Sequence, residues 1–133
     1  MLDTNLDVEK LKKLQFKIMK DVAASALIPL MRIGDQLGLF KKLSALGPIT
    51  SKNFAEEAKV DERYLREWLY ALSATDFVSY DGEKEEFSLS PEQKAVFADE
   101  EGPANMLGAY EVLAGQVYAC LLYTSDAADE ADG

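Results

Sequence analysis

Apolar residues recur at helical spacing near the middle of the chain, where the pattern is clearest. Four of them fall at i, i+3, i+4 and i+7, which is one face of a helix: Leu65, Trp68, Leu69 and Leu72. Asp61, just before this pattern, can accept hydrogen bonds from the first N–H groups as an N-cap residue. The pattern therefore predicts an amphipathic helix that begins after Asp61 and packs its Trp68 face into the core.

Two short runs with apolar residues at every second position follow that helix and predict a β-hairpin. The alternating residues are Val78, Tyr80, Phe87 and Leu89. An Asp-Gly pair between the runs is a turn signal. A two-residue loop sets Val78 opposite Glu85, whereas a four-residue loop over residues 81–84 sets it opposite Phe87. We favour the longer loop.

A shorter helix is expected before Asp61, capped by Thr50 or Ser51, and a tight turn joins the two helices. Two helices joined in this way and followed by a hairpin form a winged helix-turn-helix. Ile49 begins a short extended segment that can pair beside the hairpin. The chain is thus predicted to be mainly α with a small β-hairpin, and we assign residues 47–98 to the winged helix-turn-helix.

A further helix is marked by residues 90–93 (Ser-Pro-Glu-Gln), a capping box with Pro at the first helical position. We expect it to end near Ala98. An acidic loop follows, and Pro103 is predicted to open a last helix. The apolar positions of that helix are Met106, Leu107, Tyr110, Leu113, Val117 and Tyr118. Residues 99–119 are read as the start of a linker helix.

Lysines alternate with apolar residues over residues 7–26, which predicts an amphipathic helix. It can pack on the core with a solvated lysine face, or act as a membrane-surface or calmodulin-target helix. Its length and position also suit packing on a partner subunit.

Pro29 predicts a break in the helix near Ile28. The next helix carries Met31, Ile33, Leu37 and Phe40. Gly38 is expected to end that helix in the left-handed region. We assign residues 1–46 to these helices, with a role in dimerisation and packing.

The last residues differ in style from the rest of the chain. Residues 120–130, CLLYTSDAADE, read as the in-frame translation of a transposon-end adapter used for sequencing libraries. The alternative is a genuine acidic tail. We therefore expect residues 120–133 to be non-native and the natural protein to continue past Ala119. The tail carries four acids and no base, so a net charge of −10 for the whole chain becomes −6 without it.

The amino-acid composition excludes most kinds of catalytic site. The chain has no histidine, and its single cysteine, Cys120, lies in the tail, so imidazole bases, catalytic triads, disulfides within the chain and His or Cys metal sites are excluded. We predict no catalytic, cofactor-binding or metal-binding residue. The most apolar stretch, residues 22–31, is half of the roughly 20 residues that a membrane span needs. The N-terminus lacks a signal-peptide pattern, so we expect a cytoplasmic protein that does not enter membranes.

A winged helix can bind DNA, and that is the alternative function. Three bases could reach DNA from the second helix and the wing: Arg63, Arg66 and Lys84. Five acids surround them: Glu62, Glu67, Glu83, Glu85 and Glu86. Pairs four residues apart, Glu62 with Arg66 and Arg63 with Glu67, are the plainer interpretation of the arginines. With an acidic chain overall, nucleic acid is an unfavoured partner.

Several stretches resemble a known family. They are IGDQLGLF at 33–40, Thr50-Ser51 before Phe54-Ala55, DERYLREWL at 61–69, VSYD at 78–81 and FSLSPE at 87–92. Over about residues 20–98 the chain is similar to the N-terminal winged-helix domain of bacterial class I S-adenosylmethionine-dependent methyltransferases. The run RYLREWL is the most specific part of the resemblance.

The resemblance implies an accessory domain that mediates dimerisation and covers the substrate side of a separate catalytic domain, which binds S-adenosylmethionine. That catalytic domain is missing from this sequence, because no glycine-rich turn follows a strand. Gly108 and Gly115 lie inside a helical pattern and cannot supply it. The cofactor is therefore implied only for the full-length parent. We expect a homodimer formed through residues 7–33 and 103–118, whose apolar side chains have few partners in the chain.

Overall fold

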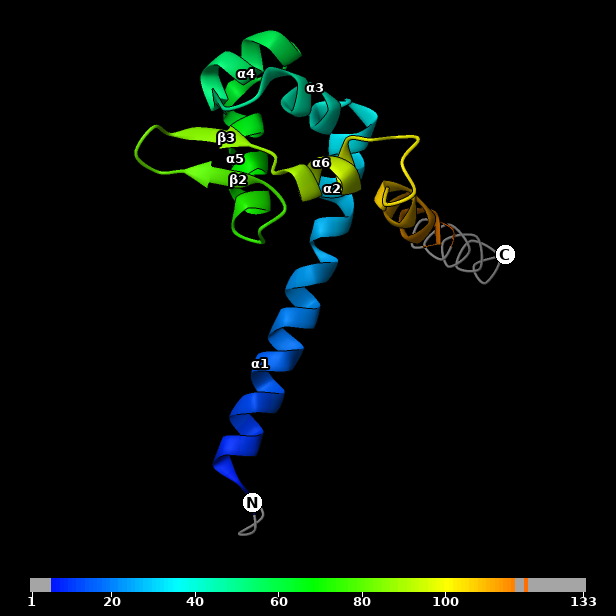
Figure 1. Cartoon of the computed structure of the whole chain (residues 1–133). Helices are drawn as coiled ribbons and strands as arrows, with labels where there is room; N and C mark the ends of the chain where they lie inside the picture. The colour runs from blue at the N-terminus through cyan, green and yellow to red at the C-terminus, as the bar shows by residue number, and fades with distance from the viewer. Residues whose placement is uncertain (1–5, 117–118, 120–133) are drawn as a thin grey trace, which may run out of the picture.

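The computed structural model describes residues 6–116 and residue 119 (Figure 1). Its helices and strands are α1 Val8–Ser25, α2 Leu27–Gln36, α3 Leu39–Leu46, β1 Ile49–Thr50, α4 Ser51–Ala58, α5 Glu62–Ser73, β2 Ser79–Asp81, β3 Glu86–Ser88 and α6 Pro91–Phe97. Residues 107–116 form a further helix. Helix α1 projects away from the rest, which packs into one body (Figure 1). The predicted fold class, mainly helical with a winged helix-turn-helix, is confirmed.

Short-range caps set the ends of the two helix-turn-helix helices. The Asp61 carboxylate accepts hydrogen bonds from Arg63 N at 2.9 Å and Tyr64 N at 3.4 Å, so α5 begins where the sequence predicts. The Thr50 hydroxyl accepts one from Asn53 N at 3.4 Å and caps α4. Lys59 ends α4 in the left-handed region, with φ 58°. These caps place α4 against α5 with only three residues between them.

The sheet has three antiparallel strands in the order β1-β3-β2. Ile49 pairs with Phe87, which confirms the extended segment expected beside the hairpin. The expected register of the hairpin is wrong, because Tyr80 and not Val78 lies opposite Phe87. The loop is 82–85, since Asp81 is itself a strand residue.

An Asx turn explains this register. The Asp81 carboxylate accepts hydrogen bonds from Glu83 N at 3.0 Å and Lys84 N at 3.2 Å. Glu85 then takes a left-handed conformation, with φ 55°, which returns the chain to the strand. Asp81 therefore holds the loop from inside the ladder instead of forming part of the loop.

Helix α6 begins with the predicted capping box. Ser90 Oγ accepts from Gln93 N, and Gln93 Oε1 accepts from Ser90 N at 2.8 Å. The same amide also accepts from Ser79 Oγ at 2.9 Å and donates to Asp76 O at 2.8 Å. Gln93 thus ties α6 to the start of β2 and to the turn that precedes it.

One hydrophobic core joins the winged helix to the helices on either side of it. The eight core residues expected from the sequence are all buried: Phe54, Leu65, Trp68, Leu69, Leu72, Val78, Phe87 and Leu89. The same cluster includes Met31, Phe40 and Leu43 from α2 and α3, together with Phe97 and Leu107. Three residues of the flanking helices were expected to have few partners in the chain: Met31, Leu107 and Tyr110. Met31 and Leu107 are instead buried, and Tyr110 packs on the core.

The break between α1 and α2 lies at Ala26, two residues before the expected position. Pro29 is the third residue of α2, in the first turn, where a missing N–H leaves no hydrogen bond unmade. Pro29 therefore lies in the first turn of α2, and the break between the helices precedes it. Gly38 has φ 64° and ends this segment in the left-handed region, as predicted.

The last described helix begins at Leu107 and not at Pro103, which lies in a turn. Asn105 Oδ1 accepts a hydrogen bond from Leu107 N at 3.1 Å and caps this start. Leu107 and Ala114 are buried, and Arg32 on α2 pairs with Glu111 at 3.0 Å. The expected positions Val117 and Tyr118 and the suspected tail, 120–133, lie outside the described residues.

Candidate functional site

The bases that could contact DNA are largely engaged by neighbouring acids. Arg66 Nη1 lies 3.1 Å and 3.0 Å from the two carboxylate oxygens of Glu62, which also accepts a hydrogen bond from Ser51 Oγ at 2.8 Å. Lys84 Nζ lies 3.8 Å from Asp81 Oδ2 in the wing. The predicted Glu62–Arg66 pair is therefore confirmed. In the part of the chain described, Arg63 is exposed and no pair with Glu67 forms within 4 Å.

A polar hollow lies between the start of α4, helix α5 and the wing. Its volume is about 330 Å³, and it is lined by Thr50, Ser51, Lys52, Arg66, Tyr70, Glu85 and Phe87. It brings Arg66 near Glu85, whereas Arg63 and Lys84 do not line it. Of the three candidate bases, only Arg66 is therefore placed to meet a ligand in this hollow.

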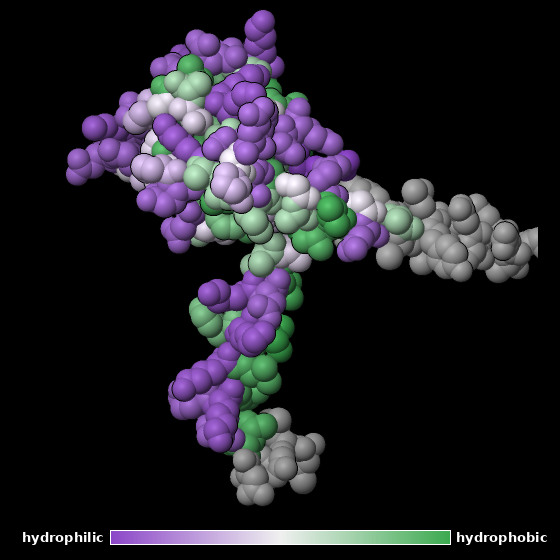
Figure 2. Space-filling view, turned by 45° about the vertical axis from the view of Figure 1, so that its right-hand side comes forward, coloured by the Kyte–Doolittle hydropathy of each residue, from purple (hydrophilic) through white to green (hydrophobic). Residues whose placement is uncertain are grey.

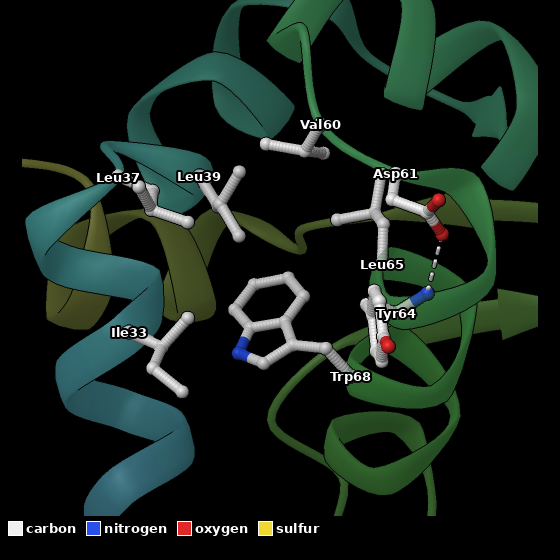
Figure 3. A pocket seen from close by; sticks show the side chains of 8 residues that line it. All are labelled: Ile33, Leu37, Leu39, Val60, Asp61, Tyr64, Leu65 and Trp68. Carbon is white, nitrogen blue, oxygen red and sulfur yellow. Dashed lines mark hydrogen bonds between the residues drawn. The ribbon is translucent and has the colours of Figure 1, made fainter.

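An apolar hollow lies on the other side of α5, and we call it the Trp68 groove (Figure 3). Its volume is about 290 Å³, and it is lined by Ile33, Leu37, Leu39, Val60, Asp61, Tyr64, Leu65 and Trp68. The Trp68 ring lies between α2 and α5, and its Nε1 donates to Leu30 O at 2.8 Å. At the rim, Ile33 is 44% exposed, Leu37 48% and Tyr64 75%. The groove is therefore a concave apolar surface open to solvent.

Gly34 explains how closely Trp68 approaches α2. A Cβ atom at Gly34 would lie 2.5 Å from Trp68 Cζ2 and 2.6 Å from Phe40 Cε2. The Phe40 and Trp68 rings in turn pack with their centroids 5.2 Å apart. Glycine is thus the residue that lets two aromatic rings lie directly on the helix.

The groove is the feature that the sequence did not predict. The periodic pattern correctly predicts that Trp68 is buried. It also assigns Ile33 and Leu37 to one helix, the helix after Pro29, but it does not show that they face solvent. A signal was present in the sequence, since Ile33 in α2 and Leu37 at its C-cap lie four residues apart, and Tyr64 lies four residues before Trp68 on α5. Only the packing of α2 against α5 brings these two pairs together.

Helix α1 carries a second apolar surface. None of its residues is buried. Figure 2 shows a hydrophobic band along one side of the projecting helix and hydrophilic residues along the other. Exposed apolar residues include Val8, Leu14, Phe16, Ile18, Met19 and Val22. The amphipathic helix is confirmed, and the interpretation that it packs on this chain's own core is wrong for most of its length.

Three ionisable groups among the described residues have shifted pKa values, and none of the shifts suits acid-base catalysis. A hydrogen bond with Tyr70, followed by burial, raises the pKa of Tyr80, and burial raises the pKa of Tyr110. Hydrogen bonds from its own backbone N–H and from Ser90 lower the pKa of Glu92 at the start of α6. Each shift moves the group further from neutrality, whereas a general acid or base works best with a pKa near the working pH.

Two other features are absent from the described residues. No group of three or more His, Cys, Asp or Glu side chains that could hold a metal ion occurs among them. No described helix is long and apolar enough to cross a membrane.

This chain is a winged helix-turn-helix domain, because a tight turn joins α4 to α5 and the wing that follows belongs to a three-stranded sheet. More specifically, the chain belongs to the family described as the Rv2258c-like winged HTH domain, whose pattern matches residues 23–98. Comparison with curated proteins gives no match.

Several solved structures share this fold. Human N-acetylserotonin methyltransferase in complex with SAM is 14% identical, with 97% of this chain and 36% of that chain covered and a TM-score of 0.65. A putative O-methyltransferase from Nostoc punctiforme is 23% identical, with 76% and 29% covered and a TM-score of 0.55. N,N-8-amino-8-demethyl-D-riboflavin dimethyltransferase (RosA) from Streptomyces davawensis is 24% identical, with 80% and 28% covered and a TM-score of 0.52.

This chain spans about a third or less of each of those proteins. At such identities the similarity shows the fold alone. The winged helix-turn-helix that the resemblance in the sequence implies is confirmed by the family match over residues 23–98, and these methyltransferase structures share its fold.

Proposed function

We propose that this chain is the accessory winged-helix domain of an S-adenosylmethionine-dependent methyltransferase. In that role it mediates dimerisation and covers the substrate side of a catalytic domain that lies beyond this sequence. We assign the cofactor to that second domain, since no glycine-rich turn follows a strand in this sequence. The whole protein acts as a methyltransferase only in combination with those missing residues.

Helix α1 is the observation that carries this proposal. It extends over 18 residues, has no buried residue, and exposes one apolar side along that length. Apolar surfaces of this extent are rarely left in water, so they mark sites of association. A domain whose lead helix is built for association supports a dimerisation role more directly than a nucleic-acid role.

The charges near α5 and the wing support the same choice. DNA binding needs bases that are free to neutralise phosphates. Here Arg66 is paired with Glu62 and Lys84 with Asp81, and Glu85 lies beside Arg66 in the polar hollow. Two of the three candidate bases are therefore already paired with carboxylates.

The protein is therefore expected not to bind duplex DNA tightly. In a fluorescence anisotropy titration at low salt, the dissociation constant should be no tighter than about 10⁻⁵ M, in the range of non-specific binding. Arg63→Ala with Arg66→Ala should leave the titration unchanged. Sub-micromolar binding that weakens steeply with salt, and is lost in this double variant, would favour the transcriptional regulator instead.

The protein is also expected to be a dimer in solution. Phe16 is 68% exposed and Met19 69%, so Phe16→Asp with Met19→Asp should place two charges in the interface and give monomers. Light scattering over a concentration series measures the mass directly. Ala24→Asp, an exposed position on the other side of α1, is the control and should stay dimeric. A monomer at high micromolar concentration, with all three proteins alike, would remove the dimerisation role.

A further inference from the structure

The apolar side of α1 continues into α2 as one stripe. Ala26, between the helices, keeps right-handed helical dihedral angles of φ −68° and ψ −17°, so the helical phase carries over. The stripe residues are spaced by three, four or seven positions: Val8, Leu11, Ile18, Val22, Ala26, Ile33 and Leu37. All of them are exposed except Leu11, which is partly buried. The stripe covers about 30 residues, or roughly 45 Å at 1.5 Å per residue.

The stripe ends in the Trp68 groove. Ile33 and Leu37, its last two residues, are also two of the residues that line the groove. The flat apolar side of α1 and the concave surface beside Trp68 are therefore one continuous surface. A helix lying along the stripe in the opposite direction would place its own first turns in the groove.

We infer that the occupant of the groove is the N-terminal half of α1 from a second copy of this chain, with the two copies antiparallel. Rotation about a two-fold axis near Val22 pairs Val22 with a copy of itself and Leu37 with the partner subunit's Val8. Each copy then supplies both a stripe and a groove, as an isologous interface requires. The inference rests on the proposed dimerisation and adds which surfaces meet and in which direction.

Charge favours this arrangement over a parallel one. Helix α1 carries five lysines and two acids, whereas the chain as a whole has a net charge of −10. In a parallel pair the two lysine-rich helices would lie side by side, and both grooves would stay open. In the antiparallel pair the lysine-rich first turns reach the partner's acidic body, where Asp61 lines the groove.

The shape of the groove favours a helix over the other occupants. A bilayer surface is flat and would not enter the hollow between α2 and α5. At about 290 Å³ the groove is at or below the lower end of the size of small-molecule sites. Its charged group, the Asp61 carboxylate, already accepts hydrogen bonds from Arg63 N and Tyr64 N.

Cysteine cross-linking tests the arrangement in the full chain with Cys120→Ser as background. A disulfide needs Cα atoms within about 7 Å, so only residues that meet across the interface will be joined. Oxidised Val22→Cys protein should give mainly disulfide-linked dimer, roughly tenfold more than Lys17→Cys, on the opposite side of the same helix. A mixture of Val8→Cys and Leu37→Cys proteins should give linked heterodimers, and neither protein alone should exceed the Lys17→Cys level.

Light scattering of the unoxidised variants separates the inference from the proposed function. If the protein is dimeric and oxidised Val8→Cys protein alone gives disulfide-linked dimers, the two helices are parallel. This result would overturn the inference and leave dimerisation intact. If the protein is dimeric but Leu37→Cys forms no disulfide with Val8→Cys, α1 does not reach the groove. This result too would overturn the inference and leave dimerisation intact. Monomers without cross-links in any variant would overturn both the inference and the dimerisation role.

Discussion

Replacing Trp68 by alanine is expected to remove most of the stability of the domain. Trp68 is 5% exposed, packs on Phe40 at a centroid distance of 5.2 Å, and donates a hydrogen bond to Leu30 O. Truncating a buried aromatic residue to alanine costs about 3–5 kcal/mol, because a cavity replaces its contacts. Small domains are stable by about 5–15 kcal/mol in total, so the variant should be largely unfolded well below the wild-type midpoint.

Urea unfolding followed by far-ultraviolet circular dichroism measures this effect, since Trp68 is the only tryptophan and its fluorescence is lost with it. Trp68→Phe is the matched variant. It keeps an aromatic ring but not the indole N–H, and should cost about 1–3 kcal/mol. If Trp68→Ala unfolds within a few tenths of a molar of wild type, the packing of α5 against α2 is not what holds the domain together.

Gly34→Ala is the second substitution expected to have a large effect, although alanine normally favours helices over glycine by about 1 kcal/mol. The new methyl group would lie 2.5 Å from the Trp68 ring and 2.6 Å from the Phe40 ring. Neither ring can move away easily, because Phe40 also stacks on Phe97 at 5.2 Å. Overpacking of this kind costs about 1–3 kcal/mol, so the net change should be destabilising.

Gly108→Ala is the control for the intrinsic preference. Gly108 lies in the helix 107–116, and nothing would lie within 4 Å of an added Cβ. This variant should be neutral or more stable by up to about 1 kcal/mol in the same urea experiment. Equal effects at the two glycines would show that close approach of the rings to α2 is not a constraint.

Features set by neighbours along the chain could be predicted from the sequence. Asp61, Thr50 and Ser90 cap the helices that the patterns assign to them, because capping needs only residues two or three positions away. The left-handed Gly38 is a prediction of the same kind. The burial of Trp68 followed from helical period alone, since one stripe on α5 is much more apolar than the rest.

Features set by tertiary packing could not be predicted. One local feature was also missed: the hairpin register depends on the Asp81 carboxylate accepting the N–H groups two and three residues on, and the Asp-Gly pair is compatible with a four-residue loop that begins at Asp81 or at Gly82. Gly34 and Gly38 look alike in the sequence, yet one ends a helix and the other makes room for rings. The Trp68 groove requires α2 and α5 to meet, and nothing local to either helix specifies that meeting.

The side chain of Gln93 has a consequence for how the wing opens. Strands β2 and β3 have three residues each, and so short a hairpin is barely stable by itself. Because one amide holds Ser79, Asp76 and the Ser90 backbone together, separating β2 from the body also breaks the cap of α6. The hairpin and α6 therefore form one cooperative unit of local unfolding, whose amide hydrogens exchange with solvent together and not strand by strand.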